Sequence, residues 1–202
     1  MNSETQILNW LVIGISQSPN SLNESFYFDK SNNEFFSILV TDYFMLDKNL
    51  DVAKNITTSY SHSNQSELVN RIKRIENEDK EIIPIPRLTN KERKDLLTQF
   101  LESIDNLEEK DRIESLYLNT ERTSFDKKFE IDGEQEIVDG WNSFKNEILI
   151  SKADSFINLN NINIRSVRVW ELEQEGNITI DLTKDDEGNV IEEKSKWWEF
   201  WK

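Results

Sequence analysis

Residues 135–159 read QEIVDGWNSFKNEILISKADSFINL and carry the pattern that most shapes the fold. Apolar side chains recur at intervals of three and four residues, as in Val138, Trp141 and Phe144. This spacing is typical of an amphipathic helix. Gly140 lies inside the pattern and weakens such a helix by about 1 kcal/mol relative to alanine. The stretch therefore predicts a long helix and, with its neighbours, a central helical bundle.

Three further helical patterns precede it. Thr89 and Glu92 form a capping-box pair, which opens a helix with an apolar face made of Leu96, Leu97, Phe100, Leu101 and Ile104. Residues 107–118 predict another helix. From Ser66 onward, apolar residues at helical spacing predict a third, whose stripe comprises Leu68, Val69, Ile72 and Ile75.

The N-terminal forty residues combine a helix with a hairpin. Residues 4–16 follow a capping-box pattern and predict the first helix. Two β-prone runs, 25–28 and 35–40, flank a polar turn and predict a β-hairpin. Residues 47–65 are polar and predict loop with a short helical turn. The Ile-Pro-Ile-Pro run at 83–86 predicts extended backbone, because proline disfavours helix at the preceding residue.

The C-terminal forty residues have a different character. Two Glu-Gly-Asn turns, at 175–177 and 187–189, separate three β-prone runs and predict an antiparallel meander. The fold expected is α+β, with a mostly helical body, an N-terminal β-hairpin and a small C-terminal β-meander. We expect a helical α+β domain over 1–162, an acidic meander appendage over 163–195 and a Trp-rich tail over 196–202.

One part of the chain resembles a known family. The motifs are Ile-Pro-Arg-Leu at 85–88, Glu92, Phe100 within TQFLESID, Phe125 with Phe129, and Trp-Asn-Ser-Phe at 141–144. Together they are similar to an uncharacterised bacterial protein family, over roughly residues 4–160. The resemblance implies a fold and no activity. The family's basic Phe-Arg-Arg-Phe element is replaced here by Phe-Asp-Lys-Lys-Phe.

Composition limits the classes of function. The chain has 202 residues, a formal net charge of −15 and no cysteine. Disulfides, thiolate metal sites and cysteine nucleophiles are thereby excluded, and nucleic-acid binding is disfavoured by charge. The five glycines form no nucleotide-binding loop. Residues 7–15 are neither a signal peptide nor a membrane span, so a cytoplasmic protein is expected.

No catalytic residue, metal ligand or cofactor site is predicted. His62, the only histidine, lies in a stretch expected to be a solvated loop. The run beginning at Asp29 starts like a calcium loop, but Glu34 and Val40 stand where glycine and glutamate are needed. The acidic run 185–187 falls on an expected turn.

Arg122, Lys127 and Lys128 interleave with Phe125 and Phe129. Basic and aromatic residues in this arrangement form a possible anion-binding patch. The alternative is a short helix whose two phenylalanines, four residues apart, are buried while the charges face water.

The residues expected to carry function are Trp197, Trp198, Phe200 and Trp201. They follow the stretch 171–193, which holds nine carboxylates and one lysine. Aromatic side chains are enriched at binding hot spots, so the tail predicts a non-enzymatic interaction or regulatory protein that docks on a protein partner. Packing of the tail on the chain's own body, and insertion into a membrane interface, are the other interpretations. Alternative functions are a carboxylate- and metal-dependent hydrolase or an acidic nucleic-acid mimic, and the oligomeric state is left open.

Overall fold

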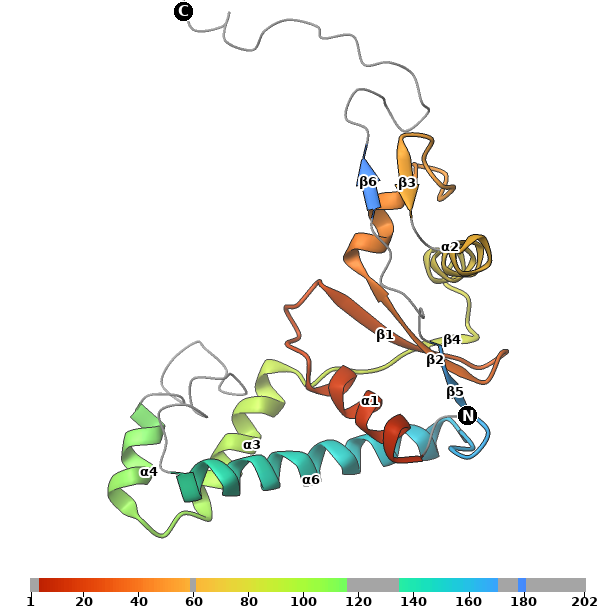
Figure 1. The fold of residues 1–202 in the computed structure, drawn as a ribbon. Coiled ribbons are helices and arrows are strands. Elements are labelled where there is room, and N and C mark those ends of the chain that lie inside the picture. Colours follow the sequence, from red (N-terminus) through yellow and green to blue (C-terminus); the bar gives the residue numbers. More distant parts are fainter. Residues whose placement is uncertain (1–3, 59–60, 116–134, 171–177, 181–202) are drawn as a thin grey trace, which may run out of the picture. The chain divides into compact units, whose positions relative to one another are not determined.

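The computed structural model describes residues 4–58, 61–115, 135–170 and 178–180. Figure 1 shows the helices and strands in chain order. They are α1 (Glu4–Ser16), β1 (Glu24–Asp29), β2 (Glu34–Leu39), the 3₁₀ helix η1 (Val40–Met45), β3 (Ile56–Thr58), α2 (His62–Glu76), β4 (Ile82–Pro84), α3 (Asn90–Glu102), α4 (Leu107–Ile113), α6 (Gln135–Leu159), β5 (Arg168–Val169) and β6 (Ile178–Ile180). The α+β class is confirmed.

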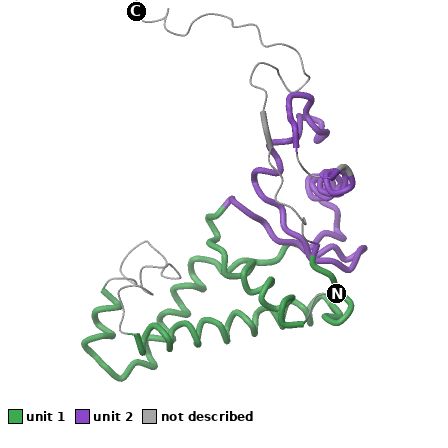
Figure 2. Tube along the Cα trace, in the orientation of Figure 1, with its two compact units in different colours: residues 1–21, 84–169 green, residues 22–83, 170–202 purple. Residues whose placement is uncertain are grey.

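The chain divides into two compact units, coloured separately in Figure 2. Unit 1 comprises residues 1–21 and 84–169, and unit 2 comprises residues 22–83 and 170–202. Each unit is therefore assembled from two separate stretches of sequence. The predicted boundaries near 162 and 195 remain predictions.

Unit 1 is helical and packs around Trp141, which is fully buried. Leu97, Phe100, Leu101 and Ile113 surround it in one hydrophobic cluster. Helices α1 and α3 both pack against α6, which is the long helix that the sequence predicted. The helix over 135–159 and the capping box at Thr89 are confirmed. The sequence predicted a helix over residues 107–118. Helix α4 ends at Ile113, and residues 116–118 lie outside the described residues.

Unit 2 is built on the predicted hairpin. β1 and β2 pair antiparallel, with Glu24 opposite Leu39 and Asp29 opposite Glu34. These two strands, which belong to unit 2, are the central pair of a four-stranded sheet of order β4-β1-β2-β5, and a separate two-stranded sheet pairs β3 with β6. A second cluster, including Phe36, Ile38, Leu68 and Ile72, joins α2 to the sheet.

Two expectations differ from the structure. The helical turn expected within residues 47–65 is present as the first turn of α2, whereas β3 takes the place of part of the expected loop. His62 is the first residue of α2, and Ser61 caps that helix by accepting a hydrogen bond from the Asn64 N–H at 3.3 Å. The strand β3 was not predicted, because its three residues, Ile-Thr-Thr, are too few to show the alternation typical of a strand.

The C-terminal strands also differ in pairing. The sequence predicted that the runs containing β5 and β6 pair with each other, whereas β5 belongs to the four-stranded sheet and β6 pairs with β3. Strand pairing depends on contacts between distant residues, and a local turn signal does not specify it. The remainder of the predicted meander lies outside the described residues.

Candidate functional site

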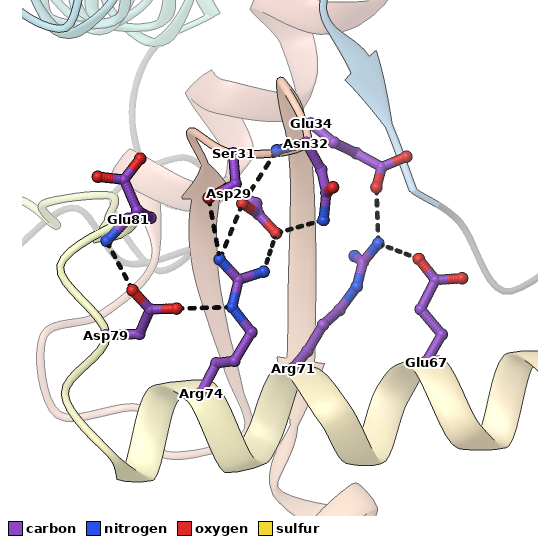
Figure 3. A network of polar contacts seen from close by, with 9 residues as sticks. All are labelled: Asp29, Ser31, Asn32, Glu34, Glu67, Arg71, Arg74, Asp79 and Glu81. Atoms are coloured by element: carbon purple, nitrogen blue, oxygen red, sulfur yellow. Dashed lines mark hydrogen bonds and ion pairs between the residues drawn. The ribbon is translucent and has the colours of Figure 1, made fainter.

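A network of charged side chains joins α2 to the turn end of the hairpin in unit 2 (Figure 3). Two arginines of α2, Arg71 and Arg74, extend towards carboxylates from other elements. We call this set the arginine cluster; it consists of Asp29, Ser31, Asn32, Glu34, Glu67, Arg71, Arg74, Asp79 and Glu81. The cluster is the candidate functional site among the described residues.

Arg71 is the buried half of the cluster, with an exposed fraction of 1%. Its Nη2 donates to Glu34 Oε2 and to Glu67 Oε1, each at 2.6 Å. Glu34 is itself buried at the start of β2, whereas Glu67 lies one turn earlier on α2 and is partly exposed. A buried ion pair is weak evidence of net stabilisation, but removal of one partner leaves an uncompensated buried charge.

Two aromatic rings enclose the Arg71 guanidinium. Its Cζ lies 4.5 Å from the centre of the Phe36 ring and 4.2 Å from that of Trp170. Trp170 is held in place by its backbone N–H, which donates to the Phe35 carbonyl at 2.7 Å. Within the described residues, Nη1 of Arg71 is buried and has no hydrogen-bond partner. Cation–π contact with these two rings therefore replaces part of the hydration that this group loses.

Arg74 forms the more exposed half. It pairs with both oxygens of Asp29 and, through Nε, with Asp79 Oδ2 at 2.7 Å. Asn32 also donates to Asp29 Oδ2 at 2.8 Å, so the same carboxylate closes the hairpin turn. The hydrogen bond to Asp29 raises the pKa of Arg74 against the opposing effect of burial. Arg74, and then the backbone N–H of Glu81, lower the pKa of Asp79.

The arginine cluster thus acts as a clamp between α2 and the hairpin. Its carboxylate oxygens accept hydrogen bonds from arginine and amide groups, so the role of the cluster is to hold these elements together. In the described parts of the chain, no group of three or more His, Cys, Asp or Glu residues is placed to hold a metal ion.

Unit 1 contains a second buried arginine. Nε of Arg93 donates to the Leu88 carbonyl at 3.2 Å, and Nη2 donates to the Ser16 carbonyl at 2.8 Å and to that of Gln17. The carbonyls of Ser16 and Gln17 lie at the end of α1, where backbone acceptors lack helical partners. Arg93 therefore caps α1 from the first turn of α3.

The neighbouring Glu92 ties α3 to α6. Its carboxylate accepts from Lys152 Nζ at 2.7 Å and from the Thr89 N–H at 2.8 Å. The hydrogen bond from Lys152, followed by that from Thr89, lowers the pKa of Glu92 to about 2. This carboxylate is consequently ionised at neutral pH and serves the capping box that the sequence predicted.

A cavity of about 560 Å³ lies between α1 and α6 in unit 1. Its lining is mostly polar and consists of Val12, Ser16, Asn142, Ser143, Lys145, Asn146 and Leu149. Lys145 is the charged group at its wall, and its Nζ also lies 5.8 Å from the centre of the Trp141 ring.

The residues singled out from the sequence lie elsewhere. Trp197, Trp198, Phe200 and Trp201 fall outside the described residues, as do Arg122, Lys127 and Lys128. Asp29, the first residue of the rejected calcium loop, instead pairs with Arg74. In the described residues, no helix is long and apolar enough to cross a bilayer.

Sequence reasoning missed the arginine cluster, although a signal was present. Arg71 lies three residues after Leu68 and one before Ile72, within the apolar stripe of α2. A charged residue on the buried face of a helix requires a buried partner. That position therefore indicated an internal ion pair but not which carboxylate would form it.

Comparison with models of protein families, with curated proteins and with solved structures finds no match for this chain. The resemblance to an uncharacterised bacterial family over roughly residues 4–160 therefore stays a prediction.

Proposed function

We propose that this protein is a non-enzymatic, cytoplasmic interaction or regulatory protein. It docks on a protein partner through the aromatic segment formed by Trp197, Trp198, Phe200 and Trp201. The composition of that segment carries the proposal, because it places four aromatic residues within five positions. Tryptophan contributes large apolar area at hot spots.

The described residues support this proposal through the roles of their charged groups. Arg71 and Arg74 fasten α2 to the hairpin, whereas Arg93 and Glu92 fix α3 against α1 and α6. These groups maintain a scaffold. The segment that follows β6 then combines acidic residues with aromatic anchors, as a docking peptide does.

The charge of the chain is consistent with a protein partner. The stretch 171–193 is strongly acidic, and an acidic surface repels nucleic acid and anionic lipid. A partner with a basic rim around an apolar pocket fits both parts of the segment. Rim charges of this kind accelerate association more than they strengthen it.

Affinity capture with two variants tests the proposal. In the first, Trp197, Trp198 and Trp201 are all replaced by alanine. In the matched control, Lys194 and Lys196 of the same segment are replaced by alanine, which keeps every aromatic residue. The proposal is supported if the intact chain and the control capture a partner that the triple variant does not. The purified partner should then show the same difference in Kd between the variants.

An identical set of captured proteins for all three chains would overturn it. So would a purified partner that binds the triple variant with unchanged Kd. A loss of three hot-spot tryptophans is expected to weaken binding at least 100-fold, since one hot-spot residue contributes about 2 kcal/mol or more.

A further inference from the structure

We propose that the exposed apolar face around η1 is an intramolecular docking surface for the chain's own Trp197–Trp201 segment. We call this face the η1 surface; it consists of Leu39, Val40, Phe44 and Val52, all of which are exposed. Docking there would make the aromatic segment unavailable until a partner displaces it. The intramolecular docking goes beyond the proposed function and does not depend on it, whereas displacement by a partner rests on that function.

The η1 surface is held in a fixed shape. Asp42 is buried and its Oδ2 accepts from the Leu39 N–H at 2.7 Å, while the Val40 N–H donates to the Asn23 carbonyl at 2.8 Å. Beyond η1, the Leu46 N–H returns to the Tyr43 carbonyl at 3.1 Å. Phe44 is nonetheless 57% exposed. Its exposure therefore arises from a hydrogen-bonded turn, and a preformed surface of this kind reduces the entropic cost of binding.

The apolar residues of this surface are neighbours through the local backbone. Leu39 is the residue that precedes η1, and Val40 and Phe44 lie within this short helical segment. Val52 forms an isolated antiparallel bridge with Leu46, two residues after Phe44. Exposed apolar residues that lie close together along the backbone can form an interaction site, whereas single ones are ordinary.

The path of the chain favours its own segment as the occupant. In the two-stranded sheet, Ile180 pairs with Ile56. Ile56 donates its N–H to the Ala53 carbonyl, and Ala53 donates to the Met45 carbonyl at 2.9 Å, at the end of η1. The last residue of β6 is therefore connected through β3 and Ala53 to the backbone of Met45 at the end of η1, and all of these residues belong to unit 2.

The length of the intervening chain is sufficient. Sixteen residues, 181–196, separate β6 from Trp197. A random coil of that length has a root-mean-square span of about 20–24 Å. Tethering at this distance gives an effective concentration of the order of 1 mM. An aromatic segment with a Kd of about 0.1 mM would therefore occupy the surface about nine-tenths of the time.

Fluorine NMR of the full-length chain labelled with 5-fluorotryptophan tests the proposal without any partner. The six tryptophan resonances are assigned by single Trp→Phe substitutions. We expect those of Trp197, Trp198 and Trp201 to differ from the same residues in a synthetic peptide of residues 193–202. Phe44→Ser should move them to the peptide positions. The matched control is Ile13→Ser on α1, which is 55% exposed and should leave them unchanged.

The remaining resonances report whether the variants fold. If Phe44→Ser also moves the Trp170 resonance, two other experiments replace this variant. One uses the milder Val40→Ser variant, and the other adds the synthetic peptide to the intact chain as a competitor. Displacement of the three tail resonances in either experiment supports the proposal. The proposal would be overturned if the tail resonances of the intact chain already lie at the peptide positions, or if Phe44→Ser does not move them. It would also be overturned if the tail chemical shifts depend on protein concentration, because this indicates docking on a second copy.

Discussion

The two units bury an arginine in different ways. In unit 2, Arg71 is buried against the carboxylates of Glu34 and Glu67 and between two aromatic rings. In unit 1, Arg93 is 2% exposed and donates to three backbone carbonyls. The first arrangement balances charge with charge, and the second satisfies neutral acceptors at a helix end. Replacement of the two arginines should therefore lower the free energy of unfolding by unequal amounts.

Arg71→Met should have the largest effect. Methionine fills part of the space between Phe36 and Trp170 but leaves the Glu34 carboxylate buried without its cation. Such a loss costs about 3–5 kcal/mol. Urea unfolding, with hydrogen exchange of β1 and β2 amides to identify the unit affected, measures the change.

A double variant separates charge from packing. Combining Arg71→Met with Glu34→Leu removes both charges, so we expect it to recover most of the lost stability. If the double variant is as unstable as Arg71→Met, the ring contacts of Arg71, and not its charge, stabilise unit 2.

Arg93→Met should cost less, about 1–3 kcal/mol. The carbonyls of Ser16 and Gln17 lose a donor, but no buried ion remains. Faster hydrogen exchange in the last turn of α1 should accompany the change, because that turn loses its cap. A cost greater than that of Arg71→Met would contradict the comparison.

Unit 1 should also lose stability in acid through Glu92. Its pKa in the folded protein is about 2, below the ordinary value of 4.5, so the ionised form favours folding. This contribution is fully present above pH 4.5 and disappears as the pH falls towards 2. Because the pair with Lys152 is partly exposed, solvent screening limits the effect to about 1 kcal/mol.

The midpoint of urea unfolding between pH 6 and pH 2.5 measures this dependence. Glu92→Gln should flatten the profile, and Lys152→Met should flatten it in part, since it removes the largest cause of the lowered pKa. An unchanged profile in both variants would show that other carboxylates control acid unfolding.

Gly140→Ala should have the smallest effect and the opposite sign. A methyl group at Gly140 in α6 would lie 3.7 Å from the Phe100 ring, which is ordinary van der Waals contact. Alanine has the higher helix propensity, so unit 1 should gain up to about 1 kcal/mol. Hydrogen exchange in α6 should slow while that in β1 and β2 stays the same. Slower exchange in both units would indicate that they unfold together.

The elements that the sequence predicted best are those specified by neighbouring residues. The ends of α6 and α1, the capping box at Thr89 and the existence of the hairpin all depend on residues within a few positions of one another. The candidate site was predicted less well. Its partners Arg71 and Glu34 are 37 residues apart, and only the polar position within the α2 stripe hinted at a buried pair.

Capping, periodicity and side-chain chemistry are local properties, so the helices, the hairpin and the aromatic segment can be recognised from short stretches of sequence. Contacts between distant residues, in contrast, pair β6 with β3, place Arg93 at the end of α1, and bring Arg71 against Phe36 and Trp170. Each of those contacts closes a loop of at least about thirty residues. Their choice depends on which distant surfaces pack together, and no short stretch of sequence contains that information.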